Sequence, residues 1–299
     1  MSIRPIKRIV EAKPTIEGAG VKLRRAFGFG NTHEFDPFLL FDDFRNESPE
    51  DFLAGFPWHP HRGIETITYV LAGSVAHGDS LGNKGEMGAG DVQWMTAGSG
   101  ILHQEMPKGD PRGRMHGFQL WANLPSSLKM TDPRYQDIPA RDIPEVTDDD
   151  GTHVRVVCGD FWGKTGPVQG VAADPRYLDV WVPPGKRKTL PVETTRHAFA
   201  YVFEGSGTFR DASQPLEPKT EIVGSPAAAG ETGNRSLVLF DSGDEVTVQA
   251  GDQGIRFLLV SGKPIEEPVA WYGPIVMNTP EQLRQAYEEL QDGTFIKKR

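Results

Sequence analysis

The segments "TITYVLAGSVAH" (residues 66–77) and "AFAYVFEGSGTF" (residues 198–209) decide the fold, because each is strand-like and the two resemble each other. Their glycines, Gly73 and Gly205, fall in register. β-branched and aromatic residues dominate both runs, which is typical of strands. Finding the same pattern in both halves of the chain indicates a tandem duplication of one β-domain.

Many other short strand-like runs are separated by glycine and proline. The chain has 34 glycines and 24 prolines, and both residue types mark turns. Short strands with turn signals between them predict an all-β sandwich or barrel. A second apparent repeat, "MGAGDVQWMTAG" with "FDSGDEVTVQAG", aligns Gly90-Asp91 with Gly243-Asp244.

The duplication predicts two domains and one helix. Residues 138–153, "IPARDIPEVTDDDGTH", are polar and rich in proline, which indicates a linker between domains at 1–140 and 141–299. A helix is expected at about residues 280–292, where Thr279 caps it, Pro280 begins it and Gly293 ends it.

Composition excludes several classes of function. The net charge of −9 argues against direct binding of nucleic acid, which requires basic patches. The single cysteine, Cys158, can form no disulfide within the chain and is expected to be a small buried side chain, which fits a reducing cytoplasm. The N-terminal segment lacks a secretory signal, and the apolar runs are too short to cross a membrane. A cytoplasmic protein is expected.

Two pairs of potential metal ligands lie in the first half. His59 and His61 are two residues apart in "WHPHRG", and His103 and Glu105 are two residues apart in "ILHQEMP". Residues two apart on a strand share a face. Three imidazoles and a carboxylate suit a divalent first-row metal and leave two open positions on an octahedral ion. The set predicts a metal centre that can bind substrate.

The second half lacks this set. The alignment of the repeats places Pro191 and Glu193 where the first half has His59 and His61, and no histidine follows Gly243. If the histidines were needed for folding, both halves should contain them. A functional role therefore explains them better than packing does.

Glu65 is an alternative carboxylate ligand. In an unbroken strand it would lie ~13 Å from His61, at ~3.3 Å per residue, which is too far to share an ion. A break at Gly63 would bring it closer. Geometry favours Glu105 as the ligand, with Glu65 further out, orienting a ligand imidazole.

Other histidines and aromatic residues have weaker signals. His116 begins a strand and is assigned to pocket lining or packing. Structural or surface positions are expected for His33, His77, His153 and His197. The candidates for an apolar pocket wall, each of which could equally be ordinary core, are Phe56, Trp58, Trp94 and Met95.

Together these motifs resemble the pirin family of bicupins. The resemblance rests on "HPHRG", "TYVLAG", "GDVQWMTAGSGILHQEMP", "HGFQLWANLP", the early "FGFGNTHEFDPFLLFDDF" and the final "GPIVMNTPEQLRQAYEELQDGTF", so it covers nearly the whole chain. It implies two tandem cupin jelly-roll barrels, of which only the first holds a metal ion. The implied ligands are His59, His61, His103 and Glu105, whereas the general cupin pattern would use Glu65.

The resemblance implies two functions of different kinds. One is a flavonol (quercetin) 2,3-dioxygenase, which opens the central ring of the substrate with O₂ and releases carbon monoxide. The chemistry of such a site predicts that Glu105 loosens from the metal and takes the proton of the flavonol 3-hydroxyl as general base. The other is a metal- or redox-responsive regulator that binds a protein partner, either as a transcription coregulator or as a regulator of a metabolic enzyme. The expected cofactor is one divalent transition metal, first Fe(II), with Zn, Mn, Ni or Cu as alternatives.

Overall fold

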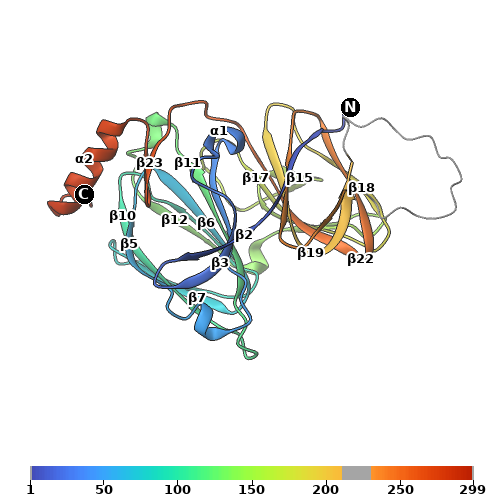
Figure 1. The fold of residues 1–299 in the computed structure, drawn as a ribbon, viewed down its shortest axis with the longest axis horizontal. Helices are drawn as coiled ribbons and strands as arrows, with labels where there is room; N and C mark the ends of the chain where they lie inside the picture. Colours follow the sequence, from blue (N-terminus) through green and yellow to red (C-terminus); the bar gives the residue numbers. More distant parts are fainter. Residues whose placement is uncertain (1, 211–229, 298–299) are drawn as a thin grey trace, which may run out of the picture. The chain divides into compact units, whose positions relative to one another are not determined.

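The computed structural model describes residues 2–210 and 230–297, and strands dominate them, as predicted (Figure 1). The chain forms two compact units, and each unit combines segments that are distant in sequence. The first barrel comprises Ala12–Ile143, Pro167–Asp174 and Pro264–Arg299, and the second barrel comprises Met1–Glu11, Pro144–Gly166 and Pro175–Lys263. The change at residue 143 falls in the predicted linker, but the two ends of the chain are exchanged relative to domains at 1–140 and 141–299.

Two antiparallel sheets form the first barrel, with strand orders β5-β10-β7-β8 and β12-β9-β6-β11-β4-β3-β2. The strands are β2 (Lys13–Glu17), β3 (Val21–Phe27), β4 (Phe38–Asp43), β5 (Phe56–His61), β6 (Ile64–Ala72), β7 (Ser74–Asp79), β8 (Lys84–Met87), β9 (Val92–Thr96), β10 (Ile101–Lys108), β11 (His116–Asn123) and β12 (Arg134–Ile138). Short helical turns are α1 (Thr32–Phe35), η1 (Pro49–Asp51), η2 (Ser126–Leu128) and η3 (Ala140–Asp142).

The burial pattern along β10 shows that two of its polar side chains face inward. Buried and less buried residues alternate along the strand, and the buried set contains Ile101, His103, Glu105 and Pro107. Because side chains on a strand point alternately to its two faces, His103 and Glu105 share the inner face, as predicted.

The C-terminal segment completes the first barrel. A hairpin of β23 (Ala270–Tyr272) and β24 (Ile275–Met277) leads into α2 (Pro280–Gln291), which contacts both strands (Figure 1). Thr279 caps α2 in a capping box with Gln282, which confirms the predicted start of the helix. Neither α-helix of the described residues has the length and apolar character needed to cross a bilayer.

The second barrel is built around a nine-stranded sheet with an apolar core. Its strands are β1 (Ile6–Glu11), β13 (Glu145–Thr147), β14 (His153–Cys158), β17 (Arg176–Val182), β18 (Arg187–Pro191), β19 (His197–Phe209), β20 (Glu231–Gly233), β21 (Ser236–Phe240) and β22 (Glu245–Gly262), with a small hairpin of β15 (Asp160–Phe161) and β16 (Lys164–Thr165). Cys158 is buried at the end of β14, as expected.

Strand pairing corrects one part of the predicted repeat. Gly73 and Gly205 are equivalent, and both have positive φ. However, β6 pairs with β9, whereas the equivalent β19 pairs with β21. The turn before β9, with Gly90-Asp91, therefore corresponds to the turn before β21, and the alignment with Gly243-Asp244 was wrong.

The corrected register changes the residues equivalent to the histidines. β18 pairs with β22 as β5 pairs with β10, and Leu190 lies opposite Val246 as His59 lies opposite His103. These positions, rather than Pro191 and Glu193, occupy the equivalent place. Leu190 and Val246 belong to the buried apolar core, so this face of the second barrel is used for packing.

Candidate metal centre

Three histidines of the first barrel converge on one point. His59 and His61 come from β5, and His103 comes from β10 directly opposite His59. One nitrogen atom of each lies within 4.8 Å of the others, and the rings of His59 and His103 are 4.3 Å apart at their centroids. Side chains alternate between the two faces of each strand, so two adjacent antiparallel strands bring the three imidazoles together on one face.

Backbone carbonyls orient two of these rings. His59 Nδ1 lies 2.9 Å from Pro57 O, and His61 Nδ1 lies 3.1 Å from Pro274 O, which belongs to the turn of the β23–β24 hairpin. A carbonyl oxygen can only accept a hydrogen bond, so each Nδ1 must donate. Each Nε2 therefore keeps a lone pair that can bind a metal.

The donor atoms fit a metal ion. His59 Nε2 and His61 Nε2 are 3.1 Å apart, and two nitrogens bound to one ion at ~2.1 Å are separated by roughly 3.0–3.4 Å in octahedral or tetrahedral geometry. Both ring nitrogens of the buried His103 lack a hydrogen-bond partner among the described residues, which is costly unless they bind another group. Burial lowers the pKa of all three histidines, to about 3 for His61, and so favours the neutral form that metals require.

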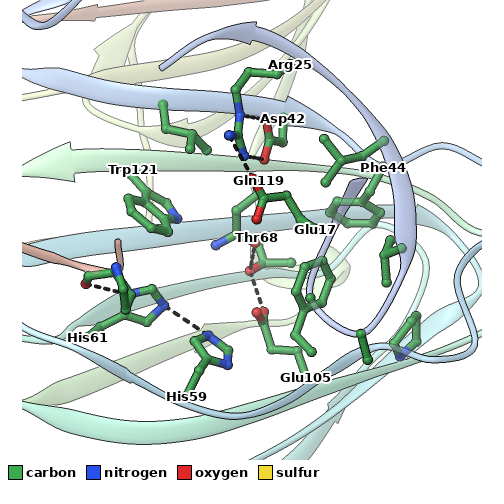
Figure 2. A pocket seen from close by; sticks show the side chains of 18 of the residues that line it. Glu17, Arg25, Asp42, Phe44, His59, His61, Thr68, Glu105, Gln119 and Trp121 are labelled. Carbon is green, nitrogen blue, oxygen red and sulfur yellow. Dashed lines mark hydrogen bonds and ion pairs between the residues drawn. The ribbon is translucent and has the colours of Figure 1, made fainter. Parts of the chain in front are cut away.

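Glu105 lines the same cavity but stands apart from the three nitrogens. Its carboxylate is not in the group of atoms within 4.8 Å of one another. Instead, Thr68 Oγ1 donates a 3.2 Å hydrogen bond to Glu105 Oε1 (Figure 2). Burial raises the pKa of Glu105 to about 7, and the Thr68 hydrogen bond opposes this shift. The roles of Glu105 as ligand and base stay predictions.

Glu65 lies outside the histidine group. The chain does break at Gly63, where φ is +77°. The Glu65 side chain nevertheless accepts a 2.7 Å hydrogen bond from Thr96 Oγ1 and is not among the residues lining the cavity. For two of the rings, backbone carbonyls take the orienting role suggested for Glu65.

A cavity of about 750 Å³ opens beside His59, His61 and Glu105, which is the size of a small-molecule site. Much of its wall is apolar and aromatic, with Phe44, Phe52, Phe56, Trp121 and Trp271 among the lining residues. The ring of Trp121 packs edge-on against His61 at 5.0 Å. The wall therefore suits a flat, aromatic ligand next to the imidazoles.

Of the four predicted wall residues, only Phe56 lines the cavity. Trp94 and Met95 are fully buried in the core, and Trp58 is 54% exposed. Trp94 and Met95 are adjacent on β9 and therefore face opposite sides of the larger sheet, and neither side chain reaches the cavity.

The remaining histidines lie outside the three-nitrogen group. His116 Nε2 is 2.6 Å from Glu47 Oε1 and does not line the cavity. His77 is buried in β7, where its Nε2 lies 3.0 Å from Gln93 Nε2. The others are His33 in α1, His153 at the start of β14 and His197 at the start of β19.

A row of polar side chains crosses the larger sheet of the first barrel, and nothing in the sequence predicts it. Thr68, Gln119, Asp42 and Arg25 are successive cross-strand partners on β6, β11, β4 and β3, and all four line the cavity. Burial raises the pKa of Asp42 to about 6, although its ion pair with Arg25 opposes the shift. Only the strand order brings these residues together.

Comparisons with known proteins agree with this architecture. The family model described as Pirin matches residues 20–122, and the model described as Pirin C-terminal cupin domain matches residues 177–296. A pirin-like protein of Caulobacter vibrioides is 44% identical, over 99% of this chain and 100% of its own. Human pirin is 39% identical, over 95% of this chain and 91% of its own.

A solved structure extends the match to the whole fold. The crystal structure of quercetin 2,3-dioxygenase from Acinetobacter baumannii superposes with a TM-score of 0.85 at 30% identity, covering 98% of this chain and 99% of its own. Both barrels are cupin domains, as the sequence motifs imply. With two such domains in tandem and both family models matched, the chain belongs to the pirin family of bicupins.

Proposed function

We propose that the protein is a metal-dependent quercetin or flavonol 2,3-dioxygenase whose metal ligands are His59, His61, His103 and Glu105. The observation that carries the proposal is a group of three imidazoles, two of them buried, beside a cavity of about 750 Å³ with aromatic walls. The similarity to the A. baumannii structure named quercetin 2,3-dioxygenase supports it further.

The ligands would hold one divalent ion, with Fe(II) as the first candidate and Zn, Mn, Ni or Cu as alternatives. His59 and His61 would bind through Nε2, because their Nδ1 atoms are held by carbonyls. When bound, the metal acts as a Lewis acid that lowers the pKa of the flavonol 3-hydroxyl and supports ring opening by O₂ with loss of carbon monoxide.

Glu105 would accept the proton of the flavonol 3-hydroxyl. Its raised pKa, about 7, makes it a stronger base than a solvated glutamate and places it near neutral pH, where general-base catalysis is efficient. Thr68 holds the carboxylate at the cavity wall. The surrounding apolar side chains exclude water from the reacting groups.

The test compares Glu105→Gln with Glu65→Gln, a matched change in a buried glutamate of the same barrel. Glutamine can coordinate through its carbonyl oxygen but cannot take a proton. We expect Glu105→Gln to keep part of its metal and to lose about 10²–10⁴-fold in quercetin turnover, whereas Glu65→Gln loses less. Metal content is measured by elemental analysis and turnover by oxygen uptake.

If Glu105→Gln turns over quercetin at the wild-type rate, Glu105 is not the general base. If the wild-type protein shows no turnover with any bound metal, the dioxygenase proposal fails. A regulator that binds a protein partner would then be the better hypothesis.

A further inference from the structure

The polar row gives the cavity a second place for polar contacts with a ligand. Figure 2 shows Thr68 next to Glu105, Gln119 beside Thr68, and Asp42 paired with Arg25 at the far end. Gln119 lies directly opposite Thr68 on one neighbouring strand and directly opposite Asp42 on the other. Residues placed in this way have Cβ atoms about 4.5–5.5 Å apart, so one ligand group can contact both Gln119 and Asp42.

Gln119 has unused hydrogen-bonding capacity. Thr68 Oγ1 lies 2.8 Å from Gln119 Oε1 and 3.2 Å from Glu105 Oε1, so its single hydroxyl proton is shared between these two acceptors. The amide nitrogen of Gln119 has no hydrogen-bond partner in residues 2–210 and 230–297, and the side chain lines the cavity. An amide with one end held and the other end free is therefore available to a ligand as a donor.

Asp42 supplies an acceptor beside this donor. Arg25 holds its carboxylate through two hydrogen bonds, Nε to Oδ1 at 2.8 Å and Nη2 to Oδ2 at 2.7 Å. Each carboxylate oxygen can accept a further hydrogen bond. Arg25 itself is occupied, since its Nη1 lies 2.9 Å from Glu17 Oε1.

A buried ion pair is weak evidence for a role in stability. Apolar residues of similar volume can often replace a buried ion pair at no cost in folding free energy. The neighbouring cavity wall is already apolar, with Leu23, Leu40 and Phe44 lining it. Recognition of a ligand explains a charged group at this place better than packing does.

A donor next to an acceptor is complementary to a hydroxyl group, which accepts one hydrogen bond and donates another. A carboxylate on the ligand would be repelled by Asp42, and Arg25 is not free to bind it. Aromatic side chains line the same cavity: Phe29 and Tyr272 are 75% and 68% exposed. Trp271 contacts Phe29 edge-on, with ring centroids 5.5 Å apart. The fitting group is therefore a hydroxyl on an aromatic ring.

We propose that Gln119 and Asp42 form a subsite for a phenolic hydroxyl of the substrate, on a part of the ligand remote from the oxygens that bind the metal. Arg25 is a positioning residue that fixes the Asp42 carboxylate. The subsite selects polyhydroxylated flavonols over unsubstituted ones. This inference rests on the proposed function, because that function supplies the orientation of the ligand at the histidines.

The test measures binding of two flavonols to zinc-loaded protein, because zinc has no redox chemistry and turnover is avoided. Quercetin and 3-hydroxyflavone share the 3-hydroxyl and 4-carbonyl, but 3-hydroxyflavone has no other hydroxyl. We expect the wild-type protein to bind quercetin at least about tenfold more tightly in calorimetric titrations at pH 8. In Gln119→Leu and in Asp42→Asn the preference should fall below about threefold, with binding of 3-hydroxyflavone unchanged.

Asp179→Asn is the matched control. In the second barrel, Arg256 holds the Asp179 carboxylate through the same two atoms at 2.9 and 2.7 Å, and this variant should keep the wild-type preference. Asp42→Asn could fail to fold because it disturbs Arg25, but Gln119→Leu removes no charge and tests the subsite independently.

The outcomes separate the subsite from the proposed function. An unchanged preference for quercetin in Gln119→Leu overturns the subsite and leaves the dioxygenase proposal standing. An equal loss of affinity for both flavonols also overturns it, because selectivity is then unaffected. If the wild-type protein binds neither flavonol, both the subsite and the proposed function fall.

Discussion

In the metal-free protein, Glu105→Gln should stabilise the first barrel at alkaline pH but not at acid pH. Burial raises the pKa of Glu105 from 4.5 to about 7 in the folded state, and the unfolded chain restores the ordinary value. The folded state therefore binds more protons than the unfolded state between about pH 4.5 and 7. Stability of the wild-type protein falls as pH rises through this window, and the full cost remains above pH 7.

The size of the effect follows from the shift. The rise of the pKa from 4.5 to about 7 corresponds to about 3 kcal/mol. The side chain is buried, so solvent screens this cost little. The variant has no proton to lose. Its stability relative to the wild-type protein should therefore increase by about 3 kcal/mol between pH 4.5 and 8.5.

Urea unfolding after removal of metal with a chelator measures this change. The effect of the side-chain exchange on packing is the same at both pH values and cancels in the comparison. Glu50→Gln, which changes an exposed carboxylate of the same barrel, is the control and should show no such change with pH. A pH-dependent difference below about 1 kcal/mol for Glu105→Gln would refute the reasoning.

Two further predictions concern the metal centre and the turn beside it. The wild-type protein is expected to hold about one metal ion per chain. His61→Ala should reduce this content far more than His197→Ala does, because His61 belongs to the three-nitrogen group and His197 does not. Equal metal contents of the two variants by elemental analysis would contradict the ligand assignment. Gly63→Ala should lower the free energy of unfolding by at least about 2 kcal/mol more than Gly82→Ala does. Both glycines have positive φ, but a Cβ on Gly63 would lie 1.9 Å from Val276 O, whereas Gly82 has open space around it. Equal melting temperatures of these two variants would show that the backbone at Gly63 shifts without strain.

The predictions that succeeded depend on local rules. His59 and His61 share a face because strand side chains alternate, and no knowledge of the rest of the fold is needed. The start of α2 follows from Thr279 and Pro280, which act within one helical turn. The glycines of the repeat also align, because both adopt a positive φ that other residues avoid.

The failures involve contacts between distant segments. A Gly-Asp pair precedes many strands, so Gly243-Asp244 resembled Gly90-Asp91 although the strand pairing puts them at different places. The row of polar side chains from Thr68 to Arg25 can be predicted only if the order of four strands in the sheet is known. No pattern in the sequence indicates that the two ends of the chain belong to different barrels from the segments next to them. The carbonyl of Pro274 contacts His61 although the two residues are 213 positions apart in the sequence. Every residue has a backbone carbonyl, so the sequence does not indicate which one will make this contact.

The contact between Pro274 and His61 also sets an order of events during synthesis. At about 5–20 residues per second, the ribosome adds Pro274 roughly 10–40 s after His61. Until then the growing chain has all three histidines but lacks the carbonyl that holds Nδ1 of His61, so either nitrogen of that ring is free to capture a metal. The hydrogen bond that holds the His61 ring can therefore form only after the C-terminal hairpin has left the ribosome.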